Sequence, residues 1–135
     1  MSILSSLHQF SDWGLLALRL GVGITFLVHG SQKRAMWKMQ PSAQMPAGLL
    51  SLLKVLSIAE PLGGLATLVG LLTQAAAAGF ILVMLGAIRL KVTQLRKGFS
   101  GEGGWELEFL LLVGAIALLF FGAGKYALDR LLLGI

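Results

Sequence analysis

Four long apolar stretches, separated by short polar segments, dominate the sequence. They cover residues 13–30, 49–71, 74–95 and 105–121. At a rise of about 1.5 Å per residue, a helix of roughly 17 to 23 residues is about as long as the hydrocarbon core of a bilayer is thick. The pattern therefore predicts an all-α protein, a four-transmembrane-helix antiparallel bundle that forms one domain over residues 1–135.

Small residues and short connections support this arrangement. The turn at 71–74 is short, which favours an antiparallel pairing of the two helices that it joins. Gly21 and Gly23 in the first stretch, and Gly63 and Gly64 in the second, let another helix approach closely. We expect these faces to be packed against protein, and we expect residues 125–135, too short to span, to form an interfacial tail.

Composition agrees with a membrane protein and excludes several functions. Hydrophobic residues make up 56% of the chain and charged residues 13%, and the mean hydropathy is +0.85. The net charge of +5 does not indicate nucleic-acid binding, because the basic residues lie at the ends of apolar stretches. The chain has no cysteine, which excludes thiol redox chemistry and iron–sulfur ligation by its own residues. We therefore expect the lipid bilayer as its first partner.

The distribution of basic residues predicts an orientation in the cell (inner) membrane. Positive residues gather in two loops, 31–48 and 96–104, and at the end of the third stretch. All three segments lie on the same side of the predicted bundle. The residues are Lys33, Arg34, Lys38, Lys91, Arg96 and Lys97. Cytoplasmic loops carry such an excess. The pattern places both loops in the cytoplasm and both termini outside.

Two charged residues lie inside the apolar stretches. Glu60 is near the middle of the second stretch and is followed by Pro61, and Arg19 is in the first. A carboxylate at that depth is costly and needs a partner. With each helix centred on its own stretch, the two residues differ in depth by about 5 Å, which predicts an Arg19–Glu60 ion pair. Two interpretations stay open: the pair fixes helix register, or it forms a proton or ligand site.

A second group of polar residues lies at the basic-loop end of the bundle. It consists of His29, Lys33, Arg89, Lys91, Glu106 and Glu108, and the residues taken as lining a possible pocket are His29, Lys33, Arg89, Glu106 and Glu108. The two glutamates are 200° apart on a helix, so one of them can face the bundle centre. Either these residues solvate the end of the bundle, or they line a polar pocket for a quinone head group, an anion or a partner loop. A lone histidine and the absence of a Glu-x-x-His pattern predict no metal site.

Several motifs, in order along nearly the whole chain, resemble the DoxX family of small bacterial and archaeal membrane proteins. They are RLGVGITFLVHGSQK from Arg19, AEPLGGLATLVGLLT from Ala59, WELEFLLL from Trp105 and GAGKYALD from Gly122. By this resemblance the family's positions fall on Arg19, Gly30, Lys33, Glu60, Gly63, Gly64, Trp105 and Glu106. The family's Gly-Pro-Gly ending is GAG here, with Ala123 in place of the proline.

The resemblance implies a four-helix membrane bundle linked to redox complexes, because the family takes its name from a subunit of thiosulfate:quinone oxidoreductase. The first hypothesis is a subunit or scaffold of a quinone-linked assembly, with redox-complex partner proteins or further copies of itself. The alternative is a carrier that binds a small molecule, lipid or quinone between its helices. A catalytic quinone-reducing subunit ranks last, so enzymatic activity stays open. A closed ion-paired core favours the scaffold, and an open cavity with apolar walls favours ligand binding.

Overall fold

The computed structural model describes residues 3–135, and its elements are all helical. A short lead-in of α1 and the 3₁₀ turn η1 precedes four long helices, and further short helices η2 and η3 follow the first and the last of them. Their bounds are α1 Ile3–Ser6, η1 Leu7–Phe10, α2 Ser11–Gln32, η2 Lys33–Lys38, α3 Ala47–Val69, α4 Thr73–Thr93, α5 Glu106–Phe121 and η3 Asp129–Leu133.

The predicted all-α antiparallel bundle is confirmed. In the described part of the chain three stretches are long and apolar enough to cross a membrane: Ile3–Lys38, which contains α2, then Ala47–Val69 and Thr73–Thr93. The fourth helix, α5, has 16 residues, or about 24 Å, and it packs antiparallel to α4.

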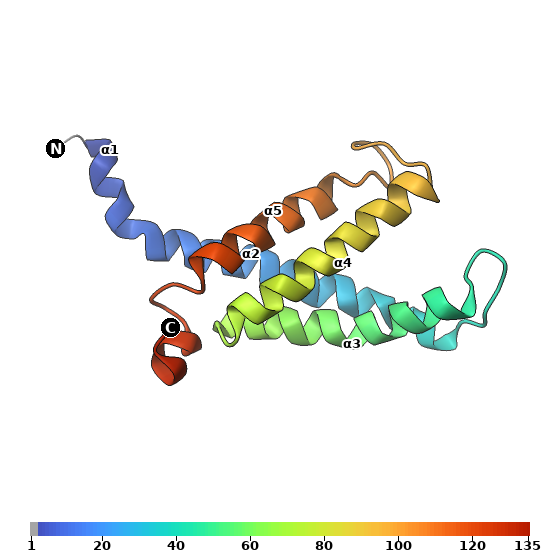
Figure 1. Cartoon of the computed structure of the whole chain (residues 1–135), viewed down its shortest axis with the longest axis horizontal. Coiled ribbons are helices and arrows are strands. Elements are labelled where there is room, and N and C mark those ends of the chain that lie inside the picture. The colour runs from blue at the N-terminus through green and yellow to red at the C-terminus, as the bar shows by residue number, and fades with distance from the viewer. Residues whose placement is uncertain (1–2) are drawn as a thin grey trace.

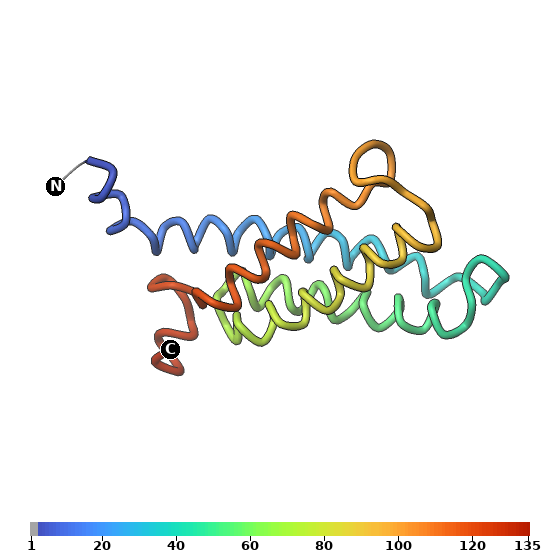
Figure 2. Tube along the Cα trace, turned by 45° about the horizontal axis from the view of Figure 1, so that its top comes forward, coloured from blue at the N-terminus to red at the C-terminus, as the bar shows by residue number. Residues whose placement is uncertain are grey.

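Two helix pairs build the bundle. In Figures 1 and 2, α2 and α3 lie side by side along most of their length, and α4 and α5 form a second pair that crosses the first. Helices α3 and α4 meet at the turn after Val69 and diverge towards the end of α4 (Figure 1). Both chain ends lie at the end of the bundle where that turn is (Figure 2), and the two basic loops lie at the other end.

Aromatic stacking holds the two pairs together at the centre. The rings of Phe26 in α2 and Phe80 in α4 stack with their centroids 3.6 Å apart. Around them lies the buried apolar core, formed by Val22, Ala77, Met84, Leu111, Ala115 and Leu118. The core joins α2, α4 and α5. The space between α3 and the C-terminal half of α4 lies outside this core.

Glycines set the register between α2 and α3. A methyl group added at Gly64 would lie 2.6 Å from the carbonyl oxygen of Gly23, and one added at Gly30 would collide with the ring of Pro61. These close approaches are those of small-residue helix interfaces in membranes. As a result Gly23 lies opposite Gly64, and Gly30 lies beside Glu60 and Pro61.

Candidate ligand-binding pocket

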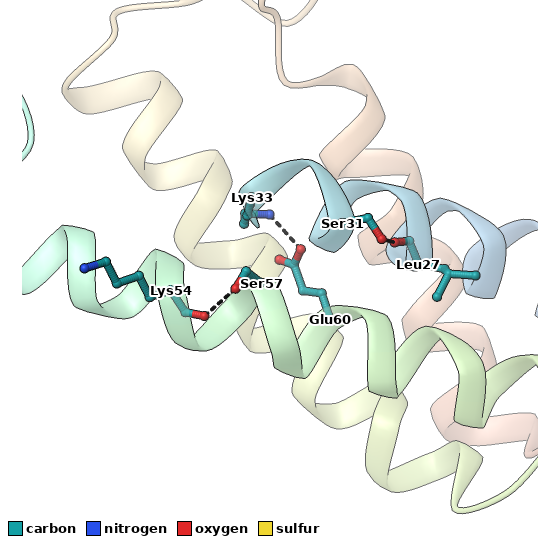
Figure 3. A network of polar contacts seen from close by, with 6 residues as sticks. All are labelled: Leu27, Ser31, Lys33, Lys54, Ser57 and Glu60. Atoms are coloured by element: carbon teal, nitrogen blue, oxygen red, sulfur yellow. Dashed lines mark hydrogen bonds and ion pairs between the residues drawn. The ribbon is translucent and has the colours of Figure 1, made fainter. Parts of the chain in front are cut away.

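The buried carboxylate of α3 has a lysine as its partner. Lys33 Nζ at the start of η2 donates to Glu60 Oε2 over 2.6 Å (Figure 3). The side chain of Glu60 is 2% exposed and that of Lys33 is 23% exposed. Lys33 can reach Glu60 because Gly30, one turn earlier, brings the end of α2 against this part of α3.

The predicted Arg19–Glu60 ion pair is therefore wrong. It assumed that the two helices are centred on each other, whereas the glycine contacts shift them along their axes. Arg19 lies at the level of Thr67, seven residues and about 10 Å beyond Glu60 on α3.

Arg19 instead joins the carbonyl groups at the end of α3 to those of the C-terminal segment. Its guanidinium donates to the carbonyl oxygens of Thr67, Leu68, Ala123 and Tyr126 over 2.7 to 3.2 Å. The last carbonyls of a helix lack partners within the helix and carry partial negative charge. Arg19 is 1% exposed, so these four carbonyl dipoles stabilise the positive charge of its guanidinium inside the protein.

Asp129 completes the attachment of the C-terminal segment. Its two carboxylate oxygens accept from the backbone N–H groups of Leu72 and Thr73 at the start of α4. Its own N–H donates to the carbonyl of Gly70 over 2.7 Å. An acidic side chain at a helix N-terminus stabilises the orphan donors there. Sequence reasoning missed this role, since nothing local to Asp129 indicates which distant helix it caps. The predicted interfacial tail is attached to the bundle at this residue.

A second lysine–glutamate pair lies between α4 and α5. Lys91 Nζ donates to Glu108 Oε1 over 2.7 Å and to the carbonyl of Gly104 over 3.0 Å. The side chain of Glu108 is 8% exposed, whereas Glu106, in the same first turn of α5, is exposed. Of the two glutamates, Glu108 is the one that faces the bundle. Lys91 belongs to the polar group that the sequence places at this end of the bundle, but it is not among the predicted pocket residues.

Each paired carboxylate keeps one oxygen without a partner. Glu60 Oε1 and Glu108 Oε2 are buried and make no hydrogen bond within the described residues. Buried polar atoms are nearly always satisfied, and an unsatisfied one calls for an explanation such as a ligand or a functional role.

A cavity of about 560 Å³ lies where α3 and α4 diverge. Polar side chains at its boundary are His29, Lys33, Glu60, Arg89, Thr93, Gln94 and Glu108. Its apolar walls are mainly leucines: Leu49, Leu52, Leu53, Leu56, Leu82 and Leu90. The structure thus brings four of the five predicted pocket residues to one cavity. Glu106 is the exception, because it is exposed and does not line the cavity.

A smaller cavity of about 150 Å³ continues along the same pair of helices. It shares Leu56, Glu60 and Val83 with the larger one, and it runs past Gly63 and Phe80. Its walls are apolar except for Glu60. The space beside Glu60 therefore has an apolar extension towards the turn between α3 and α4.

The short helix η2 is fixed over the beginning of α3. Trp37 Nε1 donates to Ser57 Oγ over 2.9 Å, and Ser57 Oγ donates to the carbonyl of Lys54 over 2.6 Å. Lys54 Nζ lies 5.7 Å from the centroid of the Trp37 ring. Figure 3 shows Ser57 and Glu60 one turn apart on α3, so these contacts hold the segment that carries Lys33.

The chain is similar to one known protein family and to individual bacterial proteins. The model of the family described as DoxX matches residues 14–94. The "Uncharacterized membrane protein Rv3486" of Mycobacterium tuberculosis is 34% identical over 146 aligned positions, which cover 92% of this chain and 84% of that protein. The "Putative oxidoreductase CatD" of Bacillus subtilis is 34% identical over 126 positions, with 91% and 90% covered. No solved structure matches the chain significantly.

Proposed function

The chain belongs to the DoxX family of membrane proteins, and we propose that it binds a small amphipathic molecule, of the quinone or lipid class, in the cavity between α3 and α4. The observation that carries this proposal is the cavity of about 560 Å³ with leucine walls and a polar boundary. Pockets of roughly 300 to 1,000 Å³, mostly apolar with a few placed polar groups, are the usual form of small-molecule sites.

The distribution of polar groups favours an amphipathic ligand. Glu60 and Glu108 with their lysines supply a polar region, and the leucines of α3 and α4 supply a wall for a hydrocarbon chain. A wholly polar ligand would leave the leucines unused, and a wholly apolar one would leave two carboxylate oxygens buried without partners. The open cavity favours ligand binding over a purely structural scaffold.

We propose that the chain is one subunit of a membrane redox-related assembly and that it contributes this site. The support is the family and the name of the Bacillus subtilis relative, "Putative oxidoreductase CatD". Since the chain has no cysteine, thiol- or cluster-based electron carriers of such an assembly would belong to a partner protein. This chain would contribute the binding pocket and the membrane anchor.

We also propose that the cavity faces the cytoplasmic half of the membrane. Lys33 begins η2 in the first basic loop, and Arg89 and Lys91 lie near the end of α4, which leads into the second basic loop. The positive-inside rule assigns the end of the bundle with these two loops to the cytoplasm and both termini to the outside.

Native mass spectrometry of protein extracted gently from its own membrane tests the proposal. We compare the wild type with Gly86→Phe, which adds a ring at a position that lines the cavity and where an added methyl group would meet no atom within 4 Å. The matched control is Gly14→Phe on α2, which is equally free of neighbours but lies away from the cavity.

We expect the wild type and Gly14→Phe to retain a quinone- or lipid-sized mass that Gly86→Phe has lost. A wild-type chain that carries no such mass, and gains none when quinones or lipids are added, would contradict the proposal. Retention by all three proteins would place the ligand elsewhere on the bundle.

A further inference from the structure

We infer that the pocket prefers a neutral head group with hydroxyl donors, so that a quinol binds more tightly than the corresponding quinone. This inference rests on the proposed function and names the chemical form of its ligand. It follows from two features of the described residues: the free carboxylate oxygens, and the balance of charge around the cavity.

The free oxygens require donors. Glu60 Oε1 and Glu108 Oε2 are buried, have no hydrogen-bond partner among residues 3–135, and belong to side chains that line the same cavity. The other oxygen of each carboxylate is occupied by a lysine at 2.6 or 2.7 Å. An ionised carboxylate is an acceptor on both oxygens. A ligand that satisfies either atom must therefore bring an O–H or N–H group.

The local charges favour a neutral donor over a charged one. Lys33 and Lys91 offset the charges of the two carboxylates. Arg89 adds a further positive charge at the cavity, and it opposes a cationic amine head group. An anionic head group brings acceptors only, so it would leave Glu60 Oε1 and Glu108 Oε2 without donors. A hydroxyl head group avoids both penalties.

A quinol and a quinone with the same side chain differ in the hydrogen-bonding groups that their rings present to these oxygens. The quinol carries two O–H donors, whereas the quinone carries two carbonyl acceptors and leaves both carboxylate oxygens unpartnered. Sites built to bond a ligand hydroxyl discriminate strongly against the analogue that lacks it. The apolar extension between Gly63 and Phe80 accommodates the hydrocarbon chain equally well in both forms.

Binding of decyl-ubiquinol and decyl-ubiquinone to the purified protein in detergent tests the inference. The quinol is measured under anaerobic reducing conditions, and the quinone in air. We expect the quinol to bind at least about tenfold more tightly. Decylamine and decanoate serve as cationic and anionic probes, and we expect both to bind more weakly than the quinol.

Equal affinities, or tighter binding of the quinone, would overturn the inference and leave the proposed pocket standing. Tighter binding of decylamine or decanoate would also overturn it. If no probe bound the wild type, the proposed function itself would fail, so the two failures are distinguishable without any variant.

Variants then locate the preference. Glu60→Gln and Glu108→Gln each replace a carboxylate by an amide, whose N–H₂ group donates to a quinone carbonyl. We expect either change to reduce the ratio of quinol to quinone affinity several-fold. Glu106→Gln is the matched control, because Glu106 is exposed and lies outside the cavity. A ratio that falls equally in Glu106→Gln would overturn the assignment to the two buried carboxylates.

Discussion

Lys33 Nζ lies 2.6 Å from Glu60 Oε2, and this contact joins the end of the first long helix to the middle of the second. It explains how a carboxylate that is 2% exposed is accommodated at membrane depth. The lysine enters from the basic-loop end, where its own side chain is still 23% exposed. The pair therefore lies between the buried core and the polar end of the bundle, at the boundary of the cavity.

The Lys33–Glu60 pair should appear as an energetic coupling. Lys33→Met leaves a buried carboxylate without its cation, and we expect it to lower the free energy of unfolding in detergent by about 2–4 kcal/mol. Adding Glu60→Gln removes that carboxylate and should recover at least about 1 kcal/mol. The double-mutant cycle is measured by denaturant unfolding followed by circular dichroism.

The control cycle combines Arg19→Met with Glu60→Gln. Because these side chains have separate partners, we expect their effects to add to within about 0.5 kcal/mol. A large coupling here, with additivity for Lys33 and Glu60, would contradict the pairing found in the structure.

Arg19 should not be replaceable by lysine. Its three guanidinium nitrogens donate to four carbonyl groups, and the single nitrogen of a lysine cannot reproduce that fork. We expect Arg19→Lys to cost about 2–4 kcal/mol and to lower the Tm in detergent, because several buried carbonyls lose their donor. Arg34→Lys, at an exposed position in η2, is the matched control and should change stability by less than about 0.5 kcal/mol. Equal, small effects of the two changes would refute the role given to Arg19.

The proposed orientation is open to cysteine labelling, since the natural chain has no cysteine. We expect Gln9→Cys to react with a membrane-impermeant maleimide in intact cells, and Ser100→Cys to react after the membrane is opened. Both residues are exposed. Gln9 belongs to η1, before α2, and Ser100 belongs to the loop between α4 and α5, and these two segments lie at opposite ends of the bundle (Figure 1). The reverse pattern would mean that the basic loops face outwards and that the positive-inside reasoning fails for this chain.

Much of the fold was predictable because the length of an apolar stretch indicates where a helix can cross a bilayer. The helix bounds Ala47–Val69 and Thr73–Thr93 lie close to the predicted stretches 49–71 and 74–95. The register between helices was not predictable in the same way. It depends on the close approach of Gly23 to Gly64, which fixes the partner of Glu60, and no hydropathy pattern reports it.

The site was predictable in its membership more than in its pairing. His29, Lys33, Arg89 and Glu108 reach one cavity because they lie at the same end of the bundle. The choice of Glu108 over Glu106 depends on the rotation of α5 about its axis, which the apolar and nearly uniform sequence of that helix does not specify.

Photolabelling with a quinone analogue that carries a photoreactive group on its ring tests the central claim most directly. The protein is reconstituted in lipid vesicles, labelled with and without an excess of unlabelled quinol, and mapped by peptide mass spectrometry. We expect labelling that the quinol prevents, confined to the cavity-lining positions within residues 49–60 and 82–94. Labelling that the quinol does not prevent, spread over outward-facing residues such as Phe120 and Phe121 of α5, would show that the cavity is not a ligand site.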